Sequence, residues 1–154
     1  SEVELLEGPP PSANLLAEKL FAAEPGIART RSVYIDSKRV VPKAVGMLIQ
    51  FDLNSAVIRP ESKAHLDSVG QMMRLERVLE KKLRVEGHAD ASGEAGHNQE
   101  LSQRRAEAVA QYLVRSHQIN PDRLTVVGRG EAQPLQNRNP YDAKNRRVQF
   151  RALN

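Results

Sequence analysis

The sequence predicts an α/β fold, a two-layer sandwich in which helices cover one face of a mixed sheet. Segments with strand-like patterns alternate along the chain with segments of helical periodicity, in the order β-α-β-α-β-loop-β. The 154 residues are enough for one compact domain with its own core. Aromatic residues make up only 4% of the chain and tryptophan is absent, so we expect an aliphatic core.

The first part of the chain has the composition of an appendage. It begins with a linker that ends in Gly8-Pro9-Pro10-Pro11, a stiff and extended sequence. Ser12 is a suitable N-cap for a short helix that runs to about Ala23. A short strand is predicted around Val33-Tyr34-Ile35. We therefore divide the chain into an N-terminal linker with a short helix/strand appendage, residues 1–44, and a main domain, residues 45–154.

The main domain opens with a mostly apolar strand over Val45–Phe51, a composition that indicates burial on both faces. Pro60 then suits the first turn of a helix. Apolar side chains recur at helical spacing after it, so this helix is predicted to continue to about Glu80.

Three strands and one helix complete the prediction. A half-buried strand covers 83–87, where apolar and polar residues alternate. A second helix is predicted over about 98–116, a third strand over 124–127 and a final strand around 148–152. The two βαβ units require parallel strands, whereas the last strand follows a loop and is free to run antiparallel.

Composition narrows the range of functions. The formal net charge of +4 is a mild excess, which fits attraction to an acidic polymer without demanding nucleic acid. Cysteine is absent from the sequence, which excludes disulfides, Cys-ligated zinc and thiol catalysis. No apolar run approaches the ~20 residues that a membrane helix needs. Because the chain begins at Ser1, we expect a processed or excised piece of a longer protein, from which an anchor can have been removed.

Arg105 is the residue that most needs an explanation. On a helical wheel it lies within the apolar arc of the 98–116 helix, between Leu101 and Val109. A guanidinium there needs a partner or a polar cavity, because an unpaired buried charge is costly. Asp90 lies fifteen residues earlier, at the exit of a strand. Two explanations stay open: a structural ion pair between Asp90 and Arg105, or a ligand that carries both a cation and an anion.

The same rim of the predicted sheet collects further polar side chains. Asn54 leaves the first strand, and Arg146 enters the last one. Asn98 stands near the start of the second helix, where a simple N-cap is the alternative explanation. Such a set suits an amino-acid-like zwitterion, because arginine binds a carboxylate and aspartate binds an ammonium group. An obvious nucleophile with a neighbouring base does not accompany these residues.

Other chemistries have weaker support in the sequence. His88 and His97 flank the loop beside acidic residues, but they lack tight ligand spacing such as HExxH, so we expect no catalytic residues, metal or cofactor. The arginine pairs at 104–105 and 146–147 lack an aromatic stacking platform, so we expect no nucleic acid partner. A pure interaction module is a further alternative, in which the apolar face within Leu15–Phe21 docks on a partner helix.

Five segments, in this order and spacing, carry a resemblance to a known family. They are FDLNSAVIRPES, EGHADASG, HNQELSQRRAEAVAQYL, RLTVVGRGEAQP and NRRVQF. Together, over about residues 45–152, they resemble the OmpA-like peptidoglycan-binding domain of outer membrane protein A, Pal-type lipoproteins and flagellar stator proteins. The resemblance implies a sheet order of 1-4-2-3 with strand 4 antiparallel.

The resemblance also implies a ligand, because the family binds the peptide stem of peptidoglycan non-covalently through diaminopimelate. Asp90 matches the acidic residue that holds the ammonium group of the ligand, and Arg105 matches the helix arginine that holds its carboxylate. Supporting positions around the pocket are matched by Asn54, Asn98 and Arg146. Ala89 stands where the family usually has Thr, and is expected to contribute backbone contacts only.

One departure from the family pattern lies near the rim, where Tyr141-Asp142-Ala143 replaces the usual Gly-Arg-Ala. Together with the charged rim, the resemblance implies a non-enzymatic anchor in the periplasm of a Gram-negative bacterium. Its partners would be peptidoglycan and a membrane tether or envelope complex, reached through further segments or the N-terminal arm. The alternative is an interaction module of an envelope assembly, with a degenerate pocket in which Asp90 and Arg105 form a structural ion pair.

Overall fold

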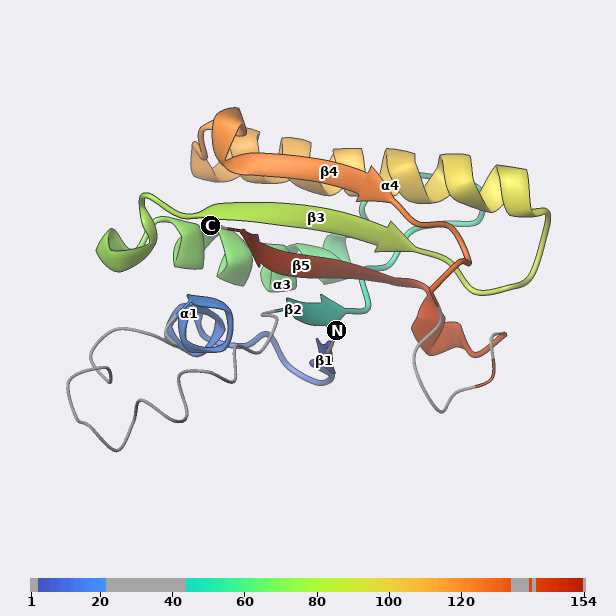
Figure 1. Ribbon diagram of the computed structural model, residues 1–154, viewed down its shortest axis with the longest axis horizontal. Coiled ribbons are helices and arrows are strands. Elements are labelled where there is room, and N and C mark those ends of the chain that lie inside the picture. Colours follow the sequence, from blue (N-terminus) through green and yellow to red (C-terminus); the bar gives the residue numbers. More distant parts are fainter. Residues whose placement is uncertain (1–2, 22–43, 134–138, 140, 154) are drawn as a thin grey trace.

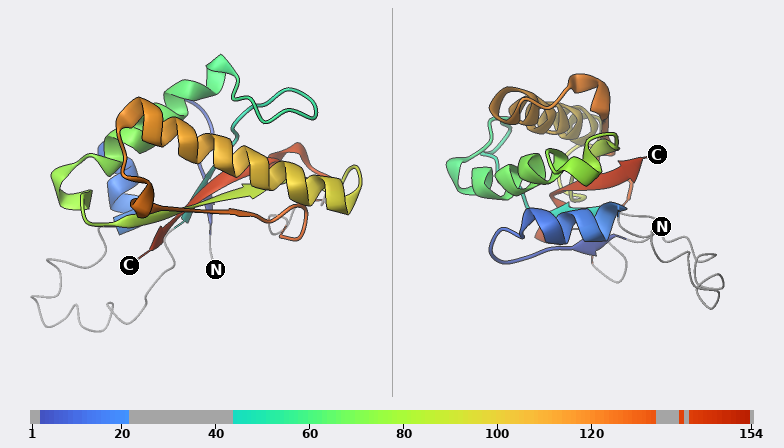
Figure 2. Two further views of the ribbon diagram at one scale, coloured as in Figure 1. Left: turned by 90° about the horizontal axis from the view of Figure 1, so that it is seen from above. Right: turned by 90° about the vertical axis from the view of Figure 1, so that its left-hand side faces the viewer.

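The computed structural model describes residues 3–21, 44–133, 139 and 141–153. Five strands form one mixed sheet, with α3 and α4 side by side on one face and α1 against α3 (Figures 1 and 2). The strands are β1 (Glu4–Leu5), β2 (Ala44–Met47), β3 (Lys82–His88), β4 (Leu124–Gly128) and β5 (Arg147–Leu153). The helices are α1 (Ala13–Phe21), α3 (Pro60–Met73) and α4 (Ala95–His117), with 3₁₀ turns η2 (Glu76–Val78), η3 (Pro121–Arg123) and η4 (Ala143–Asn145). The predicted α/β architecture is confirmed.

The four strands that the sequence predicts lie in the order β2-β5-β3-β4, which is the predicted order 1-4-2-3. β5 runs antiparallel to β2 and to β3, whereas β3 and β4 are parallel. Val85 of β3 lies opposite Phe150 of β5, and both are fully buried under the helices. The antiparallel last strand brings the start of β5 beside the end of β3, and this juxtaposition builds the functional site.

The prediction of a linker over residues 1–11 is wrong at one point, because β1 lies there. β1 pairs in parallel with β2 at the edge of the sheet, and the Leu6 N–H donates to the Gly46 carbonyl (2.8 Å). An ion pair between Glu7 and Lys144 (2.9 Å) ties the same segment to η4. A strand of two residues has no periodicity to detect, since tertiary contacts rather than a local pattern hold it in place.

The helix predicted after Ser12 is present as α1, and the Ser12 Oγ accepts a hydrogen bond from the Leu15 N–H (3.1 Å) as an N-cap does. Leu16 and Leu20 are buried in the same hydrophobic core as Phe150. α1 therefore packs on the sheet and α3 rather than standing apart from them. The strand predicted around 33–35 and the predicted helix end at Ala23 lie outside the described residues.

The helix that follows Pro60 ends at Met73, earlier than the predicted Glu80. Arg123, which lies far along the chain in η3, donates to the carbonyls of Met73 (2.8 Å), Val78 (2.7 Å) and Lys81 (3.0 Å). These bonds satisfy carbonyl groups where α3 stops and the chain turns through η2. Apolar periodicity alone does not predict where this helix ends, because the side chain that donates to its last carbonyl, Arg123, comes from another element.

The first predicted strand also ends early, because the ladder between β2 and β5 stops at Met47 rather than Phe51. The chain then turns away from the sheet. The Gln50 N–H donates to the Ser62 Oγ (2.8 Å), and the Gln50 carbonyl accepts from the Arg59 N–H (3.0 Å). Residues 48–51 thus become one wall of a cleft instead of a sheet edge.

α4 lies directly against the ends of β3 and β4, and two glycines allow this close approach. A Cβ atom at Gly87 would lie 2.3 Å from the Ser102 carbonyl oxygen, and one at Gly128 would lie 2.4 Å from the Gln103 nitrogen. α4 begins at Ala95, three residues before the predicted start. The close contact fixes the first half of α4 relative to the loop that follows β3.

Candidate ligand-binding cleft

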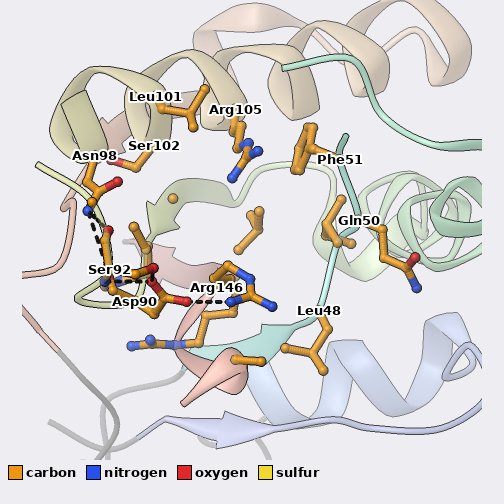
Figure 3. Close-up of a pocket in the computed structure, with 18 of the residues that line it drawn as sticks. Leu48, Gln50, Phe51, Asp90, Ser92, Asn98, Leu101, Ser102, Arg105 and Arg146 are labelled. Carbon is orange, nitrogen blue, oxygen red and sulfur yellow. Dashed lines mark hydrogen bonds and ion pairs between the residues drawn. The ribbon is translucent and has the colours of Figure 1, made fainter. Parts of the chain in front are cut away.

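A cleft of about 640 Å³ opens where β3 ends and β5 begins, beneath the first half of α4 (Figure 3). Its walls come from the β2–α3 connection, the β3–α4 loop, α4 and the junction of η4 with β5. All six residues predicted for the site line this cleft: Asn54, Ala89, Asp90, Asn98, Arg105 and Arg146. The fold therefore brings together residues that are up to 92 positions apart (146 − 54).

Asp90 supplies a buried carboxylate at the base of the cleft, with only 5% of its side chain exposed. Its Oδ1 atom accepts from the Ser92 N–H (2.9 Å) and the Ser92 hydroxyl, and its Oδ2 atom accepts from Nη1 of Arg146. Burial alone raises the pKa of Asp90, but the bonds from Ser92 and Arg146 outweigh burial and hold this pKa below its usual value of 3.8. The carboxylate is therefore ionised at neutral pH.

Arg105 is half-buried and points into the cleft from α4 (Figure 3). Its Nε atom donates to the Ser55 carbonyl (2.9 Å) and its Nη2 atom to the Asp52 carbonyl (3.1 Å). The guanidinium carbon lies 4.8 Å from the centre of the Phe51 ring, within the range of a cation–π contact. Burial, then the charges of Arg146 and Arg104, lower the pKa of Arg105.

The predicted structural ion pair between Asp90 and Arg105 is not formed. Asp90 pairs with Arg146 instead, and no carboxylate within the described ranges forms an ion pair with Arg105. Leu101 and Val109, on either side of Arg105 around α4, are both buried, so the predicted place of Arg105 within the buried arc is confirmed. The structure removes the premise of the degenerate-pocket alternative.

The two asparagines stabilise the loops that form the cleft. Asn98 is buried, and its Nδ2 atom donates to the Ser92 carbonyl (2.6 Å) and to Oε1 of Glu131 (3.0 Å), so the alternative explanation as a simple N-cap is wrong. The N-cap of α4 is Glu94. Asn54 adopts a left-handed backbone conformation (φ 55°), and its Oδ1 atom lies 2.9 Å from Nε2 of His97.

Two further residues of the rim, Ala89 and Asp142, stabilise the backbone around the cleft. The Ala89 N–H already donates to the Gly130 carbonyl (2.7 Å), which holds the end of β3 beside the chain that leaves β4. The side chain of Asp142 accepts from the Lys144 N–H (2.9 Å) and caps η4. The acidic residue at this departure from the family pattern thus has a structural role, while Ala143 beside it lines the cleft.

Residues 50–147 match the sequence model of the OmpA family. The chain belongs to the OmpA family. Among its relatives, outer membrane protein A of Bordetella avium is 35% identical over 105 residues, which cover 65% of this chain and 51% of that protein. The chain spans about half or less of the length of the curated relatives that it matches first.

Solved structures of OmpA-like domains share the fold. The OmpA-like domain of FopA1 from Francisella tularensis superposes with a TM-score of 0.61 at 21% identity, covering 71% of this chain and 70% of that one. The peptidoglycan-associated lipoprotein of Burkholderia pseudomallei superposes with a TM-score of 0.57 at 24% identity, covering 68% and 88%. Within the described residues, no helix has both the length and the apolar composition to cross a bilayer.

The two histidines considered for metal chemistry do not converge in this OmpA-family domain. His88 is buried and faces Glu86 (Nε2 to Oε1, 3.4 Å), whereas His97 contacts Asn54. Among the described residues, no group of three or more His, Asp or Glu side chains is placed to hold a metal ion.

Two residues that contact the charged groups of the cleft were not predicted from the sequence. Ser92 provides two of the three hydrogen bonds to the Asp90 carboxylate, and Phe51 provides the ring beneath Arg105. The Asp-x-Ser spacing of an Asx turn is a local signal that identifies Ser92 in retrospect. The contact of Phe51 has no such signal, since 54 residues (105 − 51) separate it from Arg105.

Proposed function

We propose that this domain binds peptidoglycan non-covalently, by holding the zwitterionic end of diaminopimelate in the peptide stem. The observation that carries the proposal is the cleft that contains an ionised, buried Asp90 and a separate, half-buried Arg105. The ammonium group of the ligand would lie at Asp90, and its carboxylate at the free donors of Arg105. A peptidoglycan-associated lipoprotein with the same fold supports this choice of polymer.

Two features of the cleft suit reversible binding rather than catalysis. Both charged groups sit in hydrogen bonds that fix their position, so little order has to be created on binding. The contacts offered to the ligand are charge-assisted hydrogen bonds, each of which contributes roughly 1.5–3 kcal/mol. Affinity for one stem is then modest, and the repeating polymer supplies avidity. We infer a non-enzymatic anchor in the periplasm, joined to a membrane protein or envelope complex through other segments.

Calorimetry with a muropeptide that contains diaminopimelate tests the proposal. Asp90→Asn and Arg105→Met should each weaken binding by about 10- to 150-fold, which corresponds to roughly 1.5–3 kcal/mol. Arg104→Met is the matched control, because it removes the same charge from the next, exposed position of α4. Melting curves show whether each variant is folded. Wild-type affinity in both cleft variants would refute the assignment.

A second ligand tests the role of Arg105 separately. A stem that contains lysine in place of diaminopimelate lacks the second carboxylate, and should bind more weakly to the wild type. In Arg105→Met the difference between the two stems should shrink, because the group that reads the carboxylate is gone. Equal affinity of the wild type for the two stems would contradict recognition of that carboxylate.

A further inference from the structure

Arg146 covers the carboxylate of Asp90 in the cleft. Among the described residues, three hydrogen bonds reach the Asp90 carboxylate, from the Ser92 N–H, the Ser92 hydroxyl and Nη1 of Arg146, and only 5% of the Asp90 side chain is exposed. A cationic ligand group therefore reaches Asp90 only if one of these donors moves away. The two donors of Ser92 belong to the same tight turn as Asp90, so they stay with it.

The Arg146 side chain is the donor that can move. It is 55% exposed, so it can turn into solvent without creating a buried cavity. Its backbone is held on both sides, by η4 before it and by the buried Arg147 after it, which donates to Gln149 Oε1 (2.6 Å) and to the Gln133 carbonyl (3.0 Å). The exchange of partners is thus confined to one side chain.

Arg105 differs from Arg146 because it is fixed. Its bonds to the carbonyls of Asp52 and Ser55 use two of the five N–H groups of a guanidinium, and both acceptors are backbone atoms that a ligand does not displace. Arg105 and Arg146 are close enough for the charge of Arg146 to lower the pKa of Arg105, in addition to burial. The cleft therefore contains Arg105 and Arg146, two cations that repel each other, and the Asp90 carboxylate, which is already paired.

We propose that Arg146 is an exchangeable counter-ion of Asp90 that makes the cleft select ligands carrying a cation and an anion together. This inference rests on the proposed function. The ammonium group of a zwitterion displaces Arg146 from Asp90, and the carboxylate of the same ligand gives Arg146 and Arg105 a shared partner. A simple amine displaces Arg146 without offering it a new partner, and adds a positive charge beside those of Arg105 and Arg146.

The experiment compares two ligands of the full chain by calorimetry, meso-diaminopimelate and 1,5-diaminopentane, which share a five-carbon chain and differ in their carboxylates. The wild type should bind diaminopimelate and discriminate strongly against the diamine. In Arg146→Gln the carboxylate of Asp90 keeps the bonds from Ser92 but has lost its counter-ion, so affinity for the diamine should rise about fivefold, as expected for an ion pair with one exposed partner. Affinity for diaminopimelate should fall by a similar factor.

Lys144→Gln is the matched control, because it removes one positive charge from the same turn, where Lys144 pairs with Glu7 rather than with Asp90. It should leave the preference between the two ligands within about twofold of the wild type. A ligand-free measurement accompanies it: NMR titration should show that Arg146→Gln raises the pKa of the Asp90 carboxyl, whereas Lys144→Gln does not.

Three results would overturn the inference. Equal weakening of both ligands in Arg146→Gln would make Arg146 an ordinary contact. An unchanged pKa of Asp90 in that variant would mean that the two side chains are not paired in solution. If the wild type binds diaminopimelate and Arg146→Gln keeps the same preference, only this inference fails, whereas a wild type that binds neither ligand also refutes the proposed function.

Discussion

The close approach of α4 to the sheet gives a sharp prediction for Gly87→Ala. A Cβ atom at this position would lie 2.3 Å from the carbonyl oxygen of Ser102, well inside van der Waals contact, and it would touch backbone rather than a side chain that can rotate away. α4 must therefore move away from β3. Overpacking of this kind typically costs 1–3 kcal/mol, so we expect a loss of about 2 kcal/mol and a fall in Tm of about 6 °C.

Gly96→Ala provides the control, because Gly96 also lies in this part of the chain but has no atom within 4 Å of the position of its added Cβ. The free energy of unfolding of this variant should lie within about 1 kcal/mol of the wild-type value, since alanine is a better helix former than glycine. Thermal unfolding followed by circular dichroism measures both variants. Because α4 carries Arg105 and Asn98, Gly87→Ala should also weaken ligand binding. A Gly87→Ala protein that melts with the wild type would refute the packing argument.

Two further predictions concern stability. Burial alone raises the pKa of Glu86, but His88 and Arg151 lower it to about 2, from 4.5 in the unfolded chain. This lowered pKa contributes about 3 kcal/mol to the free energy of unfolding above pH 4.5, and the contribution is lost as the pH falls toward 2. Burial lowers the pKa of His88, so the loss of stability begins as the pH falls through 6.5. Urea unfolding at a series of pH values measures this. Below pH 4.5 the free energy of unfolding of Glu86→Gln should depend less on pH than that of the wild type. Arg123→Met removes three hydrogen bonds to carbonyls and should cost about 2–4 kcal/mol in urea unfolding, whereas Arg77→Met, which loses one exposed bond to Asn14, should cost less than about 1 kcal/mol.

The elements of the OmpA-family fold were largely predictable from local pattern. Alternation predicted β3 and β5, helical spacing predicted α3 and α4, and Ser12 and Pro60 marked the starts of two helices. These signals work because burial of one face imposes a period of two on a strand and of 3.6 on a helix. Where the elements end was less predictable, since Arg123 and Gln50 terminate α3 and β2 through contacts with distant residues.

The sequence also predicted which types of residue form the candidate site and where along the chain they lie. A guanidinium within an apolar arc and a carboxylate at a strand exit identified Arg105 and Asp90. Their places on the same rim added Asn54, Asn98 and Arg146, and the resemblance added Ala89. A charge in such a position needs compensation whatever the fold, so the sequence by itself determined that the charges of this rim need partners or a polar cavity.

Only the tertiary structure decided which groups pair. Asp90 bonds to Arg146, 56 residues away, and Arg105 bonds to the carbonyl of Ser55, 50 residues away. Neither partner follows from spacing along the chain, because partner choice depends on how β5 returns antiparallel beside β3 and on where β2 leaves the sheet. The sequence specified the charges, and the three-dimensional packing bonded Arg105 to backbone carbonyls and Arg146 to the Asp90 carboxylate.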